Sequence, residues 1–177
     1  MDYRILQWVA FVTRNIGNMS KGQKKGSSFE REVCVALSRW ITHGTRADVL
    51  WRTAMSGGRA TVFKNHPEYR SGGDLTAVAQ EGYAFCEEFY CEMKFLKSLD
   101  FHGLIKDCGK LVLIWRDTVK QAQHYGRSPL LIARENFTPD IFVTDHMIQD
   151  QYPSLFSYDH DMCVYRFEDI LKLKYQP

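Results

Sequence analysis

One short segment limits the possible folds of this chain more than any other. Residues 88–96 read EFYCEMKFL, in which apolar and polar side chains alternate. Successive side chains of a β-strand point to opposite faces of a sheet, so this alternation predicts a strand that is buried on one side. Tyr90, Glu92 and Lys94 would share one face. The opposite face would be turned to a core and carries Cys91, Met93 and Phe95.

Further elements follow from apolar spacing and turn residues along the rest of the chain. Residues 80–82 would form the turn that pairs a strand at 74–79 with the one at 88–96. The order of elements is typical of an α/β domain with a central mixed sheet flanked by helices. Other short apolar runs predict strands at residues 49–52, 130–133, 141–144 and 163–166. Helical spacing predicts helices at about residues 28–42, 111–125 (ending at Gly126) and 167–174.

The start of the chain is expected to be separate from this domain, which would comprise residues 29–177. Helical spacing of apolar residues predicts an amphipathic helix within residues 1–19, which could cap the core or pair with a second subunit. Its apolar run is shorter than the roughly 20 residues that span a bilayer, and no small-residue cleavage site follows. We therefore expect a cytoplasmic protein without a membrane partner. Residues 20–28 predict a linker, either a solvated hinge or a basic arm that touches phosphates.

Composition sets the broad class of the chain. Its 177 residues, 45% of them hydrophobic and 14% aromatic, are enough for a substantial core. A formal net charge of +2 is too small to indicate a nucleic-acid partner by itself. The five cysteines form no CxxC pair and fit no zinc spacing, so we expect reduced thiols.

Two carboxylates are predicted to converge beside the strand at residues 88–96. Asp74 begins the neighbouring strand after two glycines, so Asp74 and Glu92 would meet on one side of the sheet. Paired carboxylates repel each other, and a divalent cation between them favours the ionised form of both. Oxygen ligands suit Mg²⁺ or Mn²⁺ better than zinc, and the Met93 carbonyl could be a further ligand.

A third acid, Glu30, lies inside the apolar arc of the helix predicted at about residues 28–42. Two interpretations stay open: Glu30 closes a capping box with Ser27, or it completes the metal shell directly or through water. A metal in this group would polarise a phosphoryl oxygen and lower the pKa of a bound water. Lys94 could orient that water and offset charge in the transition state, so the group has what phosphodiester hydrolysis requires.

Four short motifs follow one another along the chain. They are Gly26-Ser-Ser-Phe-Glu30-Arg-Glu32, Arg52-x-x-x-Ser56-Gly-Gly58, Gly73-Asp74-Leu and Cys91-Glu92-Met-Lys94. In this order they resemble the motifs of the PD-(D/E)XK nuclease superfamily, with the nearest resemblance to the archaeal-type Holliday junction resolvases. Three features differ from the family pattern: Gly73 stands where a proline is usual, the loop from Ser56 to Asp74 is longer than expected, and residues 135–177 have no clear counterpart.

The resemblance implies a restriction-endonuclease-like fold and a DNA endonuclease that depends on Mg²⁺, with Mn²⁺ able to substitute. It implies that Glu30, Asp74 and Glu92 hold the metal and that Lys94 supports the nucleophile. The favoured substrate is branched DNA, such as a four-way junction, cut by a homodimer. The alternatives are another nuclease of the superfamily, restriction-type or from phage recombination, and a non-catalytic nucleic-acid-binding protein of the same fold.

Contacts with DNA are expected from the same motifs and from the positions of basic residues. The family often carries a catalytic glutamine on the helix after the strand, which matches Gln121 or Gln123, and we prefer Gln121. A loop serine near the scissile phosphate matches Ser56. The expected DNA-binding set is Lys21, Lys24, Lys25, Arg52, Ser56, Arg59, Lys64 and Arg70. Aromatic side chains that either stack on bases or belong to the core are Trp51, Tyr69, Tyr90 and Trp115.

Overall fold

The computed structural model describes residues 21–53, 71–106, 108–149 and 151–176. Its larger sheet is mixed, because the two strands at one edge run parallel and the other neighbours run antiparallel. The predicted central mixed sheet is therefore confirmed, with β4 at its edge. In spatial order the strands are β4 (Phe89–Leu96), β5 (Ser128–Glu135), β6 (Ile141–Thr144), β8 (Met162–Arg166) and β7 (Leu155–Ser157).

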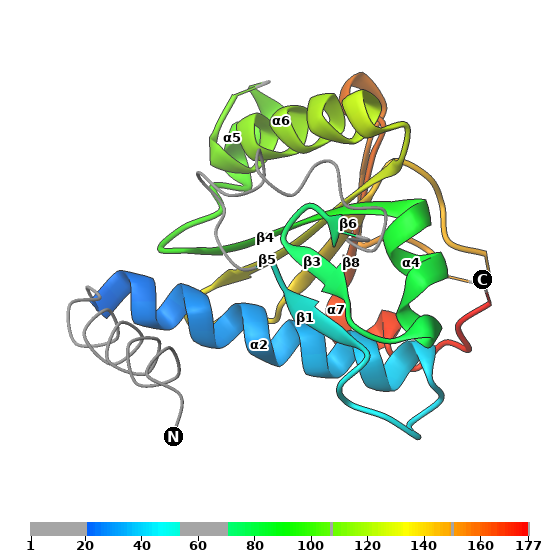
Figure 1. Ribbon diagram of the computed structural model, residues 1–177. Helices are drawn as coiled ribbons and strands as arrows, with labels where there is room; N and C mark the ends of the chain where they lie inside the picture. The colour runs from blue at the N-terminus through cyan, green and yellow to red at the C-terminus, as the bar shows by residue number, and fades with distance from the viewer. Residues whose placement is uncertain (1–20, 54–70, 107, 150, 177) are drawn as a thin grey trace.

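Helices cover both faces of this sheet (Figure 1). Helix α2 (Lys21–Ile41) lies on one face and α6 (Lys110–Tyr125) on the other, with the short α5 (His102–Ile105) next to α6. Helix α6 ends where Gly126 takes a left-handed conformation, with φ 64°, as expected for a glycine stop. Two apolar clusters, one on each face of the sheet, form the core. The predicted α/β class with flanking helices is thus confirmed.

A second, smaller sheet carries part of the candidate site. It is antiparallel and meets the larger sheet at a parallel bridge between Gly73 and Cys91. Because its middle strand pairs only within this sheet, the predicted hairpin between residues 74–79 and 88–96 is wrong. In spatial order its strands are β1 (Leu50–Arg52), β3 (Leu75–Ala77) and β2 (Ser71–Gly72).

The segment that was expected to be a hairpin turn is instead a turn followed by a helix. The 3₁₀ turn η1 (Gln80–Gly82) leads into α4 (Tyr83–Glu88). Phe85 of α4 is buried, and its ring lies 6.4 Å from that of Trp40 on α2. This contact joins residues far apart in sequence, so local turn signals could not predict the helix.

Helix α2 begins earlier than the sequence predicts. The linker expected at residues 20–28 is wrong for residues 21–28, which are helical. Ser27 therefore lies inside the helix, so the capping box with Glu30 is wrong as well. This first part of α2 contains Gly22 and Gly26. A glycine inside a helix costs about 1 kcal/mol relative to alanine, and the burial of Phe29 in the core helps to offset that cost.

The C-terminal part of the chain completes the sheet and the core. After β7, the 3₁₀ turn η2 (Tyr158–His160) leads into β8, and α7 (Phe167–Ile170) is shorter than the helix predicted at residues 167–174. Beyond α7, the Leu173 carbonyl accepts a hydrogen bond from Trp40 Nε1 over 2.8 Å. The rings of Tyr175 and Trp40 lie 5.0 Å apart. Residues without a counterpart in the resemblance thus pack around α2.

Two further expectations can be compared with the structure. All five cysteines are free, as predicted. Among the described residues, no helix has the length and apolar character needed to cross a membrane. The helix expected within residues 1–19 lies outside the described residues.

Candidate active site

Edge strand β4 carries an acid and a cation side by side. Glu92 is in register with Leu131 of β5, whose side chain packs in the core cluster beneath α6. Glu92 and Lys94 therefore point to the α6 face of the sheet. The Lys94 ammonium donates a hydrogen bond to the Glu92 carboxylate. The opposite face of the strand is buried at Cys91 and Met93, as the alternation predicts.

The backbone of β4 also holds Asp74, which lies in the short turn between β2 and β3. The Asp74 N–H donates to the Cys91 carbonyl over 2.8 Å. The Met93 N–H in turn donates to Asp74 Oδ2 over 2.9 Å. Because Met93 separates Glu92 from Lys94 along the strand, these two bonds bring Asp74 beside the Glu92–Lys94 pair.

The turn that carries Asp74 requires glycine at residue 73. Gly73 has φ +75°, and a Cβ added there would lie 2.3 Å from the Cys91 carbonyl oxygen. Proline fixes φ near −65°, so the proline of the family pattern could not adopt this conformation. The departure at Gly73 therefore has a physical reason: the turn presses against the backbone of β4.

Glu30 reaches the same region from α2. Its Oε2 accepts a hydrogen bond from Arg52 Nη1 over 3.1 Å, and both side chains are half-buried. Its helix neighbours Phe29 and Val33 are buried, so the apolar arc around Glu30 is confirmed. The pairing with Arg52 resolves how the chain accommodates an acid on this arc.

Burial and neighbouring carboxylates disfavour the ionised form of Asp74. Burial and then the negative charge of Glu92 raise the pKa of Asp74 to about 6; Glu30 adds to the rise, while the Met93 N–H and Lys94 oppose it. Burial lowers the pKa of Lys94, but its hydrogen bond to Glu92 and the surrounding carboxylates outweigh burial and raise that pKa overall. Lys94 is therefore a cation at neutral pH. Its charge does not fully offset the effects of burial and of the neighbouring acids on ionised Asp74.

The sequence of the chain matches a known protein family over most of its length. A family described as "Phage putative PDDEXK endonuclease" matches residues 21–174. The chain belongs to this family. It is a PD-(D/E)XK enzyme, a metal-dependent nuclease that acts on DNA. No curated protein and no solved structure matches the chain. The family match favours the alternative of a phage nuclease over the archaeal-type junction resolvases, for which the comparisons give no support.

The PDDEXK site is the candidate site formed by Glu30, Asp74, Glu92 and Lys94, and the chemistry of its donors suits a divalent cation. Glu30, Asp74 and Glu92 offer carboxylate oxygens, the ligands that Mg²⁺ and Mn²⁺ prefer. A cation would also offset the burial and repulsion that raise the pKa of Asp74. In the described part of the chain, no three His, Cys, Asp or Glu side chains are gathered closely enough to hold a metal ion. In this arrangement Arg52 holds Glu30 and Lys94 holds Glu92.

Helix α6 approaches the PDDEXK site through its last turns. Tyr125 of α6 stacks on Tyr90 of β4, with ring centroids 5.5 Å apart and planes 11° apart. Gln121 lies one helical turn before Tyr125 on the same side of α6, and its side chain is half-buried. Gln123 is exposed. The preference for Gln121 over Gln123 and its catalytic role stay predictions.

The aromatic residues of interest divide between core and surface. Trp115 is fully buried and its Nε1 donates to the His160 carbonyl over 2.8 Å, so it belongs to the core. Trp51 on β1 is 48% exposed and remains available to a partner. Tyr90 lies two residues before Glu92 on β4, and burial and then the charges of Glu92 and Asp74 raise its pKa to about 12. Tyr69 lies outside the described residues.

The expected DNA-binding residues are only partly described. Arg52 contacts Glu30, and Lys25 is exposed on α2 with its ammonium 5.8 Å from the centre of the Phe95 ring. The other members of the set lie outside the described residues or side chains: Lys21, Lys24, Ser56, Arg59, Lys64 and Arg70.

Two contacts near the site were not predicted from the sequence. One is the Arg52–Glu30 pair, and the other is a set of hydrogen bonds from Thr53 to the turn at Asp74. Neither contact has a signal in the spacing or periodicity of the sequence.

Proposed function

We propose that this endonuclease hydrolyses phosphodiester bonds of DNA in a Mg²⁺-dependent reaction centred on Asp74, Glu92 and Lys94. The observation that carries the proposal is the hydrogen bond from the Met93 N–H to Asp74 Oδ2. This bond links the Asp74 carboxylate, which comes from the smaller sheet, to Met93 of β4. Met93 lies between Glu92 and Lys94 in the sequence. The family match gives the reaction class, and this geometry supports the choice of residues.

Glu30, Asp74 and Glu92 would hold the cation, with the Met93 carbonyl as a further ligand and Mn²⁺ as a substitute metal. When bound, such a cation polarises a phosphoryl oxygen and makes a bound water more acidic. Lys94, held protonated by the surrounding acids, donates a hydrogen bond to the attacking water and offsets negative charge as it develops. Asp74 stays in place through its two backbone hydrogen bonds to β4. Gln121 on α6 is a further proposed catalytic residue.

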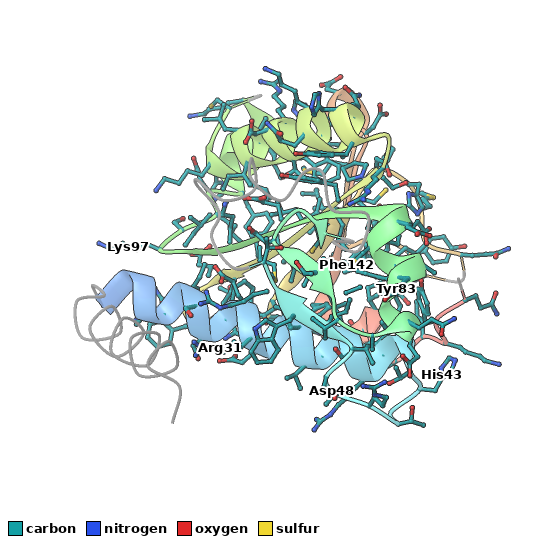
Figure 2. The ribbon with its side chains drawn as sticks, viewed as in Figure 1. Arg31, His43, Asp48, Tyr83, Lys97 and Phe142 are labelled. Carbon is teal, nitrogen blue, oxygen red and sulfur yellow. The ribbon has the colours of Figure 1, made fainter. Side chains whose placement is uncertain are left out.

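The DNA backbone would pass the end of β4 beside the N-terminal half of α2. Lys25 on α2 lies over the Phe95 ring of β4, and Lys97 just beyond β4 is exposed and points outwards (Figure 2). These two cations lie near the end of β4, the strand that also carries Glu92 and Lys94. We assign phosphate contacts to the whole expected set, Lys21, Lys24, Lys25, Arg52, Arg59, Lys64 and Arg70, with Ser56 near the scissile phosphate.

A preference for branched DNA and a homodimer joined through residues 1–19 rest on the motif resemblance. Two opposed sites related by a two-fold axis would cut two strands of a junction. The basic segment at residues 21–25 would then follow directly on the dimer contact. Sedimentation of the DNA complex tests the dimer, and a strict monomer bound to DNA contradicts it.

A cleavage panel with Mg²⁺ tests the proposed function. The substrates are closed circular duplex, linear duplex, single strand, flap and four-way junction, each with and without EDTA. We expect cleavage of the closed circle that EDTA abolishes, because only an endonuclease can cut a molecule without ends. Unchanged activity in EDTA, or activity that requires ends, contradicts the proposal. Faster cutting of the junction than of the linear duplex supports the branched substrate, and equal rates contradict it.

A further inference from the structure

We propose that Thr53 is a positioning residue that fixes the Gly73–Asp74 turn and thereby places the Asp74 carboxylate for metal binding. Thr53 directly follows β1. This inference rests on the proposed function, because it takes Asp74 as a ligand of the catalytic cation. It names a residue that acts through Asp74, and it makes the end of β1 a part of the site.

Thr53 contacts the turn with both its backbone and its side chain. The Thr53 N–H donates to the Asp74 carbonyl over 2.8 Å. The Thr53 hydroxyl donates to the Gly73 carbonyl over 2.9 Å. Thr76 Oγ1 lies 2.9 Å from Thr53 Oγ1, and because the Thr53 hydroxyl has only one proton, the Thr76 hydroxyl donates in that pair. Two successive carbonyls of the turn are thus held by one residue.

The other side of the turn is held by β4. The Asp74 N–H donates to the Cys91 carbonyl over 2.8 Å, and the Asp74 carboxylate accepts from the Met93 N–H over 2.9 Å. Strands β1 and β4 belong to different sheets and do not pair with each other. The Gly73–Asp74 turn is therefore held by hydrogen bonds on two sides, from β4 of the larger sheet and from Thr53 at the end of β1. Loss of the Thr53 hydroxyl would loosen the turn where the acid is carried.

The residue before Thr53 holds a second acid of the site. Arg52 donates to Glu30 over 3.1 Å. Adjacent residues at the end of β1 therefore contact the helical acid and the turn acid, which come from elements far apart in the chain. A shift of this strand end would move Glu30 and Asp74 relative to each other, and metal ligands tolerate only small changes in their separation.

Three variants of the full-length protein test the role of the hydroxyl. Thr53→Val removes the hydroxyl and keeps the shape and the backbone N–H, whereas Thr53→Ser keeps the hydroxyl. Thr45→Val is the matched control, because Thr45 Oγ1 donates to the Thr42 carbonyl over 2.8 Å in a turn that follows α2. The first readout is amide hydrogen exchange of Asp74 and Met93 in metal-free protein. The second is the calorimetric affinity for Mn²⁺ without DNA.

We expect Thr53→Val to speed exchange of the Met93 and Asp74 amides about fivefold, in line with the loss of one hydrogen bond. We expect it to weaken Mn²⁺ binding by a similar factor and to lower kcat for DNA with little change in KM. Thr53→Ser should restore all three quantities, and Thr45→Val should leave them unchanged.

Equal exchange and equal Mn²⁺ affinity in Thr53→Val and the unaltered protein would overturn the inference, and so would a Thr53→Ser variant as impaired as Thr53→Val. If Thr53→Val does not fold, Thr53→Ala compared with Thr53→Ser answers the same question. Exchange and metal affinity are measured without DNA. A protein that cuts no DNA therefore contradicts the proposed function and leaves the test of Thr53 intact.

Discussion

The negative charge of Asp74 destabilises the metal-free folded protein. Burial and the neighbouring Glu92 raise its pKa from 3.8 to about 6. Between about pH 4 and pH 6, the metal-free folded state therefore binds more protons at this carboxyl than the unfolded state does. The stability of the metal-free protein consequently falls as the pH rises through this window. The carboxylate that costs stability is the one that a cation would use.

Asp74→Asn is expected to stabilise the metal-free protein above pH 6. At about 1.4 kcal/mol per unit of pKa shift, we expect the free energy of unfolding at pH 8 to rise by about 1–3 kcal/mol, with no gain at pH 4. Urea unfolding at the two pH values in EDTA measures the difference. Asp159→Asn, at an exposed position on η2, is the control. Destabilisation by Asp74→Asn at pH 8 contradicts the electrostatic account.

Gly73→Ala tests the close approach of the turn to β4. The new Cβ would meet the Cys91 carbonyl oxygen at 2.3 Å in addition to straining φ. Gly44→Ala isolates the second effect, because Gly44 has φ +85° and no atom within 4 Å of the added Cβ. A strained φ costs about 1–2 kcal/mol, so we expect that loss for Gly44→Ala and a larger loss, with reduced cleavage, for Gly73→Ala. Equal losses in thermal unfolding argue against the clash.

Helix α6, which carries Gln121, packs against β4, which carries Glu92 and Lys94. The Tyr90–Tyr125 stack ties the end of this helix to the strand two residues before Glu92. Helix α6 thus packs beside the site on one face of β4. The acids Glu30 and Asp74 come from α2 and from the turn between β2 and β3, which lie earlier in the chain.

Gln121→Ala and Gln123→Ala form a matched pair on α6. A hydrogen bond to a charged group contributes about 1.5–3 kcal/mol, so Gln121→Ala is expected to lower kcat of DNA cleavage by roughly tenfold or more. Gln123 is exposed, so its alanine variant should cut at the normal rate. Single-turnover cleavage measures both. The reverse order of effects would assign the role to Gln123.

The lysines near the start of α2 give a prediction for DNA affinity. Because residues 21–28 are helical, positions 21, 24 and 25 lie within one turn on one side of a helix. Replacing Lys21, Lys24 and Lys25 by alanine should weaken DNA binding and reduce the slope of log affinity against log salt by up to about three. Lys174→Ala, at an exposed position far along the chain, is the control. An unchanged salt slope rejects phosphate contact by this segment.

For the whole molecule, local patterns predicted the elements whose burial follows one simple period. The alternation in β4 placed Glu92 and Lys94 on one face, and the predicted strand at residues 141–144 coincides with β6. Helix α4 and the early start of α2 depend on packing against distant residues, as with Phe85 against Trp40. No period in the sequence records such contacts. For the same reason the acids were predictable and their partners Arg52 and Thr53 were not.

The C-terminal segment shows how the same limit applies to a whole region. Residues 135–177 had no counterpart in the motif resemblance, yet β6, β7 and β8 form most of the larger sheet, and Tyr175 packs against Trp40. The family match extends through residue 174. This region supports β5, which in turn supports edge strand β4 and its acids.

The most direct test of the account is cleavage of closed circular DNA with Mg²⁺ by Asp74→Asn and Glu92→Gln beside the unaltered protein. DNA binding is measured in parallel, and Glu168→Gln on α7 serves as the control. We predict that both site variants lose cleavage and bind DNA as well as or better than the unaltered protein, because negative charge next to phosphate is removed. The control should cut normally. Cleavage retained by either site variant would contradict the assignment of the active site.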